Sequence, residues 1–324
     1  MCNQEQDVSI SEFLEVGTQL YVSGHYTEMI GFCREFLKIS NDERIHSMLA
    51  LAQSAINDTE NVNTTSGHND IISFALSHDI TIFGYKTDFI MKSVLHNKAF
   101  YEEDMLKKWF HYGAFKVVLD IGANIGNHTL FFASNSPDAE VYSFEPMPVN
   151  YKLLAANVSN NQLSSRVHLY NKAVGDIKCC ARMKLISANN NGTARITEDD
   201  DQDSETVEVV VIDDLNLPDP DFIKIDTEGH EVQVLRGMKK TLNRSNAFVW
   251  LEIDAENALE VYQIMDSLGY EVVDYSLLWV NNVLFGKATQ KLYPTGHAFA
   301  SLLKWSTEIN ERLLQLLSSK SGAP

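Results

Sequence analysis

The stretch from residue 117 to residue 130, VVLDIGANIGNHTL, combines residue types suited to binding a nucleotide. Its first three residues form an apolar run that predicts a buried strand, which Asp120 ends. Gly122 and Gly126 bracket a tight turn, and we expect Asn127 to cap the helix that follows. Glycines suit such a turn because a side chain would hinder a left-handed backbone or the approach of a ligand. An ordinary strand-to-helix connection is the alternative interpretation.

The spacing within this turn distinguishes between ligands. A dinucleotide-binding turn has glycine at its first, third and sixth positions, but Asn124 and Asn127 stand where its second and third glycines would be. The chain instead carries D-x-G-x-N-x-G, and Glu145 follows Asp120 by 25 positions, at the end of the next apolar strand. A carboxylate there can accept hydrogen bonds from both hydroxyls of a ribose. The pair therefore predicts a nucleoside site without a pyrophosphate, which indicates S-adenosylmethionine.

Four segments extend this pattern: DIGANIGNHTL, SFEPMPVNYKLLAANV, NKAVGD and FIKIDTEGHEVQVLRGM. In order and separation they resemble the FkbM family of S-adenosylmethionine-dependent methyltransferases, over roughly residues 70–290. The resemblance implies a class I methyltransferase-like α/β fold with a doubly wound sheet. It also implies O-methylation of a sugar, glycan or secondary metabolite, and an N-acceptor stays open. The residues expected at the cofactor are Asp120, Gly122, Ala123, Asn124, Gly126, Glu145, Pro146 and Ala173.

The segment KIDTEGHE is the most concentrated source of catalytic groups. Asp120, Glu145, Asp226 and Glu252 all end predicted strands, so we expect them to converge at one edge of the sheet. Methyl transfer needs a nucleophile held in line with the sulfonium, and a hydroxyl must also lose its proton. The candidate bases are Asp226, Glu228 and His230. The alternative is that Gly229 and Glu231 serve the helix start and that His230 packs structurally.

Two weaker hypotheses concern the same region. Asp226, Glu228 and Glu252 are residue types that bind Mg²⁺, but their spacing matches no known ligand signature, so we predict no metal. In the FkbM family a segment before the cofactor turn lies near the substrate opening. Tyr101 and Glu102 are therefore candidates for the acceptor site, with an aromatic residue packed under a helix cap as the favoured alternative.

The chain is expected to have four parts. Residues 1–57 predict a helical appendage that faintly resembles one tetratricopeptide unit, and the polar residues 58–70 predict a linker. Residues 71–290 form the methyltransferase domain. Residues 291–324 form a C-terminal helical extension whose apolar positions suggest docking on the N-terminal helices or a homodimer.

Within the domain, alternating patterns predict a parallel sheet with helices. Residues 179–187 and 206–212 predict a hairpin in place of one crossover helix. The acidic run EDDDQD at 198–203 is either a cation site or, more simply, a solvated loop. Cys179 and Cys180 are adjacent, which fits buried thiols better than a disulfide.

Composition excludes several classes of partner. The formal net charge of −18 opposes binding to nucleic acid or to an anionic membrane. We see neither a signal peptide nor an apolar run long enough to span a membrane, so we expect a cytoplasmic protein. A small-molecule or glycan acceptor is the expected partner. A non-catalytic, cofactor-binding scaffold that works through its N-terminal helices is the alternative function.

Overall fold

The computed structural model describes residues 71–76, 79–111, 113–187, 190–197, 204–254, 256–276 and 281–287, together with isolated positions between 29 and 49. The chain divides into two compact units, and these seven ranges, except residue 276, lie in the unit formed by residues 68–275 and 281–307. The fold below is that of this unit. The predicted linker and C-terminal extension, and nearly all of the N-terminal appendage, lie outside the described residues, so their boundaries stay predictions.

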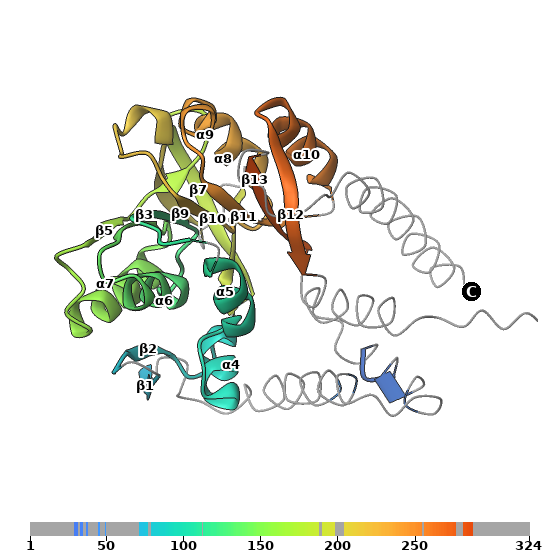
Figure 1. The fold of residues 1–324 in the computed structure, drawn as a ribbon. Coiled ribbons are helices and arrows are strands. Elements are labelled where there is room, and N and C mark those ends of the chain that lie inside the picture. The colour runs from blue at the N-terminus through green and yellow to red at the C-terminus, as the bar shows by residue number, and fades with distance from the viewer. Residues whose placement is uncertain are drawn as a thin grey trace, which may run out of the picture. The chain divides into compact units, whose positions relative to one another are not determined.

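The described residues form a central seven-stranded sheet (Figure 1). In spatial order its strands are β5 (Val167–Tyr170), β4 (Glu140–Phe144), β3 (Val117–Ile121), β10 (Phe222–Ile225), β11 (Phe248–Ile253), β13 (Asn281–Lys287) and β12 (Tyr270–Ser276). The pairs from β5 to β11 are parallel, whereas β13 runs antiparallel to β11. The chain runs outward from β3 to β5 and then returns to β10 on the other side of β3. This reversal confirms the expected methyltransferase-like α/β fold, and it creates the switch point beside which such sheets bind ligands.

Helices cover both faces of this sheet (Figure 1). One face carries α5 (Glu103–Phe110), α6 (Asn127–Asn135) and α7 (Pro148–Asn160). The other face carries α8 (Glu231–Gly237), α9 (Lys239–Arg244) and α10 (Ala258–Ser267). Helices α8 and α9 follow each other in the chain and meet at Met238.

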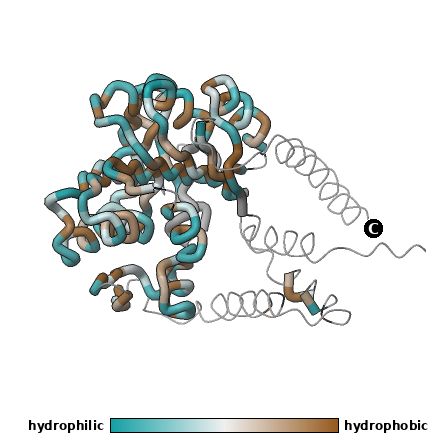
Figure 2. The backbone as a smooth tube through the Cα atoms, viewed as in Figure 1, coloured by the Kyte–Doolittle hydropathy of each residue, from teal (hydrophilic) through white to brown (hydrophobic). Residues whose placement is uncertain are grey.

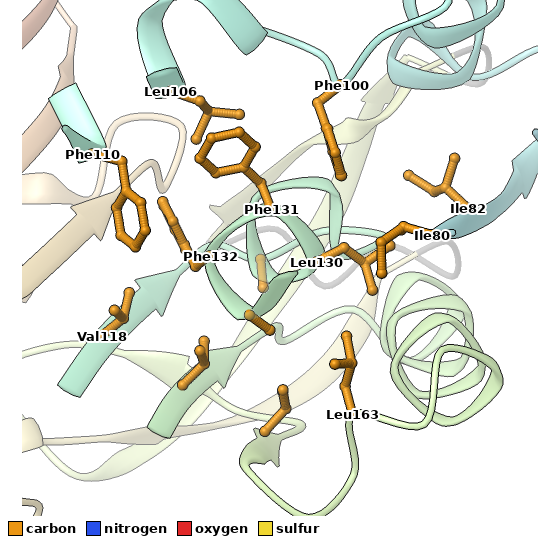
Figure 3. Packing of buried hydrophobic residues seen from close by; sticks show 14 of the residues in the cluster. Ile80, Ile82, Phe100, Leu106, Phe110, Val118, Leu130, Phe131, Phe132 and Leu163 are labelled. Atoms are coloured by element: carbon orange, nitrogen blue, oxygen red, sulfur yellow. The ribbon is translucent and has the colours of Figure 1, made fainter. Parts of the chain in front are cut away.

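The core lies in two layers because successive side chains of a strand point to opposite faces. In β3, Val118 belongs to the cluster beneath α6, which also contains Phe110, Leu130 and Phe132 (Figure 3). The next residue, Leu119, belongs to the cluster on the other face. Strands buried on both faces are continuously apolar, and the sheet therefore forms a hydrophobic band in Figure 2.

A hairpin precedes the cofactor turn. It pairs β1 (Ile71–Ala75) with β2 (Thr81–Tyr85), and α4 (Phe89–Asn97) follows. Asn157 of α7 and Asn161, which directly follows this helix, bind the backbone of β2. Asn157 Oδ1 accepts from Phe83 N at 2.7 Å while its Nδ2 donates to Phe83 O at 2.9 Å, and Asn161 makes the same pair of bonds with Thr81. These side chains fix the hairpin to the helix.

A second, four-stranded sheet lies between β5 and β10 in the sequence. Its order is β6 (Ala173–Val174), β9 (Glu205–Val210), β7 (Cys179–Ser187) and β8 (Asn190–Thr197). The predicted antiparallel pairing of 179–187 with 206–212 is confirmed, but β8 was not predicted. Cys179 and Cys180 are both exposed, so the expectation of buried thiols is wrong.

The acidic run at 198–203 lies outside the described residues. No helix among those described is long and apolar enough to cross a bilayer.

Candidate functional site

The predicted glycine turn connects β3 with α6 at the switch point. Gly122, Asn124 and Gly126 all have left-handed backbones, with φ angles of 83°, 50° and 93°. The N–H groups of Gly122 and Ala123 both donate to Phe144 O, at 3.0 and 2.9 Å, which ties the turn to the end of β4. Helix α6 then begins with no side-chain cap on its N-terminal N–H groups. This is the geometry expected of a turn that approaches a nucleotide closely.

Gly122 is required by the protein's own packing. A Cβ at this position would lie 1.7 Å from Asp226 O. The sequence predicts that a side chain here would hinder a left-handed backbone or the approach of a ligand. In the structure, the first atom that such a side chain would meet belongs to the backbone of the loop after β10.

Asn127 does not cap the helix that follows the turn. It is the first residue of α6, and its side chain instead makes two bonds with the backbone of Tyr101. Asn127 Oδ1 accepts from Tyr101 N at 2.9 Å, and Asn127 Nδ2 donates to Tyr101 O at 3.0 Å. The predicted capping role is therefore replaced by a link between the cofactor turn and the segment before α5.

Glu145 lies immediately after β4 and is only 5% exposed. Its two carboxylate oxygens accept from Asn124 N and from Met147 N, each at 2.8 Å. Burial raises the pKa of Glu145 to about 7, although those two N–H groups and the charge of Lys224 act in the opposite direction. The carboxylate thus stands beside the turn, where sequence reasoning placed it.

Asp120 is completely buried and shares its surroundings with a buried lysine. Asp120 Oδ2 accepts from Thr129 Oγ1 at 2.5 Å, while Asp120 Oδ1 is 4.0 Å from Lys224 Nζ and has no hydrogen bond among the described residues. Lys224 Nζ donates to Asp226 Oδ2 at 2.9 Å and to Gly122 O at 3.1 Å. Burial lowers the pKa of Lys224, but the carboxylates of Asp226 and Asp120 outweigh it and the net pKa is raised.

Carboxylates from three separate segments gather at this edge of the sheet. Burial, and then the charges of Asp226, Glu102 and Glu228, raise the pKa of Glu252 well above its ordinary value. Burial and the same set of carboxylates also raise the pKa of Tyr101. Together with the lysine contacts, this confirms that the acids at the strand ends converge. The same interactions place Tyr101 and Glu102 in this group of carboxylates. From the sequence, structural packing was the favoured role for these two residues.

A buried pair supports the segment that carries Tyr101. His128 Nε2 lies 3.1 Å from Glu102 Oε2, and the two side chains are 5% and 6% exposed. The His128 ring packs edge-on against Trp250, with centroids 5.1 Å apart. Glu102 itself has a left-handed backbone, φ 60°, which is strained for a residue with a side chain. Such strain is common where function fixes a residue in place.

His230 stands apart from the carboxylates. Its Nε2 lies 3.3 Å from where a Cβ on Gly175 would be, at the end of β6. Burial lowers the pKa of His230, and the charge that opposes this is Asp176. Of the three predicted bases, Asp226 and Glu228 therefore join the carboxylate group, whereas His230 packs toward the second sheet.

Glu231 braces the loop after β10, which is the structural role considered for it from the sequence. Its Oε1 accepts from Gly229 N at 2.8 Å and from Thr227 Oγ1 at 3.1 Å, and its Oε2 accepts from Asn257 Nδ2. This network holds the chain around Glu228 and Gly229, both of which have left-handed backbones.

The remaining predicted cofactor residues lie around the end of β4. Ala123 is buried within the turn, and Gly126 N donates to Ala123 O. Pro146 O accepts from Asn171 Nδ2 at 2.9 Å. Ala173 is buried in a small cluster with Met147, the residue that donates to Glu145. All three therefore border the turn or the Glu145 loop. Among the described residues, no group of three His, Cys, Asp or Glu side chains is arranged to hold a metal ion.

Sequence reasoning missed Lys224 and His128. Lys224 interrupts the apolar strand FIKI, which ends directly before Asp226. A single lysine within an apolar strand is the signal by which Lys224 could have been identified. The role of His128 depends on Glu102, which is 26 positions away, so no local pattern marks it.

The order of the sheet and the turn at its switch point define a methyltransferase-like α/β domain. Within it, residues 120–272 match the family model described as the methyltransferase FkbM domain. This match confirms the resemblance to the FkbM family that the sequence motifs indicated.

Two curated relatives support the same family. The chain is 33% identical over 146 residues to hexuronic acid methyltransferase AglP of Haloferax volcanii, across 43% of this chain and 56% of AglP. It is 43% identical over 51 residues to 31-O-demethyl-FK506 methyltransferase FkbM of Streptomyces tacrolimicus, across 16% of this chain and 20% of that protein. The chain thus spans about half the length of the first relative and a fifth of the second.

Among solved structures, a methyltransferase FkbM from Methylobacillus flagellatus aligns at a TM-score of 0.41 and 14% identity. The alignment covers 84% of this chain and 60% of that one.

Proposed function

We propose that this chain is an S-adenosylmethionine-dependent methyltransferase that transfers a methyl group to a hydroxyl of a sugar-like acceptor. The observation that carries the proposal is the arrangement of the D-x-G-x-N-x-G turn and Glu145 beside a group of carboxylates at the switch point. The family match over residues 120–272 supports the same activity.

The residues at the turn fit this cofactor chemically. Its ribose hydroxyls and its ammonium are hydrogen-bond donors, so a matching site needs acceptors. Asn124 Oδ1 and Asp120 Oδ1 are buried acceptors with no hydrogen-bond donor among the described residues, although Asp120 Oδ1 lies 4.0 Å from the Lys224 ammonium. The Glu145 carboxylate has lone pairs beyond the two that its N–H donors use. Unpaired buried acceptors are uncommon in folded proteins, which favours a bound donor at this place.

Within such a site the cofactor supplies an electrophilic methyl group. Glu145 would bind the ribose, and Asn124 would orient the ligand from the turn. Asp226 and Glu228, on the neighbouring loop, would accept hydrogen bonds from the acceptor hydroxyl and hold it in line with the methyl group. Glu252 lies in the same group of carboxylates, and burial and its acidic neighbours raise its pKa above the ordinary value.

The carboxylates of the site favour an acceptor that carries hydroxyl groups. Carboxylates bind neighbouring hydroxyls well because each oxygen accepts hydrogen bonds, and the site brings together four carboxylates with the phenol of Tyr101. AglP, by its name, methylates a hexuronic acid, and this supports a sugar as the acceptor here. The position of the methylated hydroxyl follows from loops that differ between such enzymes.

Calorimetry and labelled turnover test this function in two steps. The protein should bind S-adenosylmethionine at micromolar concentration, and Asn124→Ala, which removes the unpaired acceptor, should weaken that binding. A panel of neutral and uronic-acid sugars with methyl-labelled cofactor should then yield a methyl ether that is stable to mild base. Absence of cofactor binding would refute the proposal. Binding without turnover on any sugar would instead favour a cofactor-binding scaffold or an N-acceptor.

A further inference from the structure

Lys224 is an ionic group in the interior of a parallel sheet. It stands in β10 between Ile223 and Ile225, both fully buried, and its own side chain is 3% exposed. An ammonium at such a position is costly unless carboxylates and other acceptors surround it. The contacts of Lys224 must therefore account for its place in the core.

Those contacts join two loops that serve different parts of the site. Lys224 Nζ donates to Gly122 O, in the turn after β3, and to Asp226 Oδ2, in the loop after β10. Asp120, its neighbour across the sheet, lies 4.0 Å away. Because Lys224 lies opposite Asp120 in the register of β10 with β3, the ammonium emerges where both loops begin.

The backbones of the same two loops are also in direct contact. Asp226 N donates to Ile121 O at 3.0 Å. Asp226 O lies so close to Gly122 that only glycine fits there. The backbone of Asp226 is thus fixed against the turn, and the ammonium fixes its carboxylate.

We propose that Lys224 is a positioning residue that holds the Asp226 carboxylate in place against the cofactor turn. This rests on the proposed function, in which Asp226 faces the acceptor. Lys224 is too buried to touch an acceptor, whereas the Asp226 side chain is 26% exposed. The ammonium occupies one carboxylate oxygen and leaves the other for the acceptor hydroxyl.

Substitution of Lys224 tests the idea first in the free protein. Lys224→Met removes the charge at similar volume, and Lys224→Arg retains it. The matched control is Lys107→Met, which breaks a surface lysine–glutamate pair on α5. Amide hydrogen exchange should accelerate at least tenfold in both residues 122–126 and residues 226–230 of Lys224→Met. Exchange should change in neither segment of Lys107→Met and less in Lys224→Arg than in Lys224→Met.

Measurements of kcat distinguish a positioning role of Lys224 from a purely structural one. At saturating cofactor and acceptor, Lys224→Met should lower kcat at least tenfold, and the double variant with Asp226→Asn should be no slower than the slower single variant. Lys224→Arg, which keeps the cation, should lower kcat less than Lys224→Met does.

Each outcome decides the matter. A folded Lys224→Met protein with native exchange in both segments overturns the proposal, as does a kcat within twofold of the native value. Multiplicative effects of the two substitutions overturn it as well. If Lys224→Met fails to fold, Asp226→Asn alone must accelerate exchange at residues 122–126, or the proposal fails. If the native protein binds no S-adenosylmethionine, the proposed function is wrong. The hydrogen-exchange experiment then still tests whether Lys224 couples the two loops.

Discussion

Glu145 should make nucleoside binding depend on pH. Burial raises its pKa to about 7 in the free protein, so at pH 6 about nine carboxyl groups in ten carry a proton, and at pH 8 about one in ten does. Ribose hydroxyls donate hydrogen bonds, which favour the ionised form. Affinity should therefore rise about tenfold between pH 6 and pH 8.

The best ligand for this measurement is 5′-methylthioadenosine, because it carries the ribose without the titrating amino acid of the full cofactor. Calorimetry at pH 7 in buffers of different ionisation enthalpy should show release of about half a proton per ligand bound. Glu145→Gln should lose about 1.5–3 kcal/mol of affinity at pH 8, the usual scale for hydrogen bonds to a charged group, and should lose the pH dependence. Glu140→Gln, at a half-buried position at the start of β4, is the control.

The same pKa shift has a consequence for stability, with a definite sign. A carboxyl group whose pKa is higher in the folded state binds its proton more tightly there, so it stabilises the fold below pH 4.5. That contribution, about 3 kcal/mol for a shift from 4.5 to about 7, is lost as the pH rises through 7.

Affinity that is equal at pH 6 and pH 8, or higher at pH 6, would refute the assignment of Glu145 to the ribose.

Three further substitutions test other parts of the site. Gly122→Ala should lower the free energy of unfolding by more than about 3 kcal/mol in denaturant titration, because its Cβ meets Asp226 O and its backbone is left-handed; native stability would contradict this. His230→Ala should keep kcat within about threefold while Asp226→Asn lowers it at least about tenfold, and the reverse order would restore His230 as the base. Asn157→Leu leaves three backbone groups unpaired and should cost about 3 kcal/mol or more in thermal unfolding; a cost below about 1 kcal/mol would show that water replaces the side chain.

Much of the fold could be predicted because the central strands are buried on both faces. Apolar residues fill most positions of β4 and β11, and the strand that the sequence predicts before Glu145 is β4. Strand β8 escaped prediction because its sequence, NNGTARIT, is mostly polar and carries a glycine, and only its pairing with β7 makes it a strand.

In the site, too, some features could be predicted from the sequence and others could not. The turn and Glu145 could be predicted because local spacing determines them, whereas contacts across the sheet could not. The direction in which His230 packs depends on Gly175 and Asp176 of another segment. The contacts of Lys224 depend on its register with β3, which no single strand reveals.

Asn157 and Asn161, at the end of α7, are spaced so that the rise of the helix matches the rise of strand β2. Four helical residues rise about 6 Å and two strand residues about 6.6 Å, so Asn157 and Asn161 meet Phe83 and Thr81 in turn. Asn157 also donates to Ile125 O in the cofactor turn. Insertion of one residue between the asparagines would rotate them apart by about 100° and release the hairpin. Insertions after Tyr85 would leave both bonds intact, so the chain should tolerate changes of length there and not within α7.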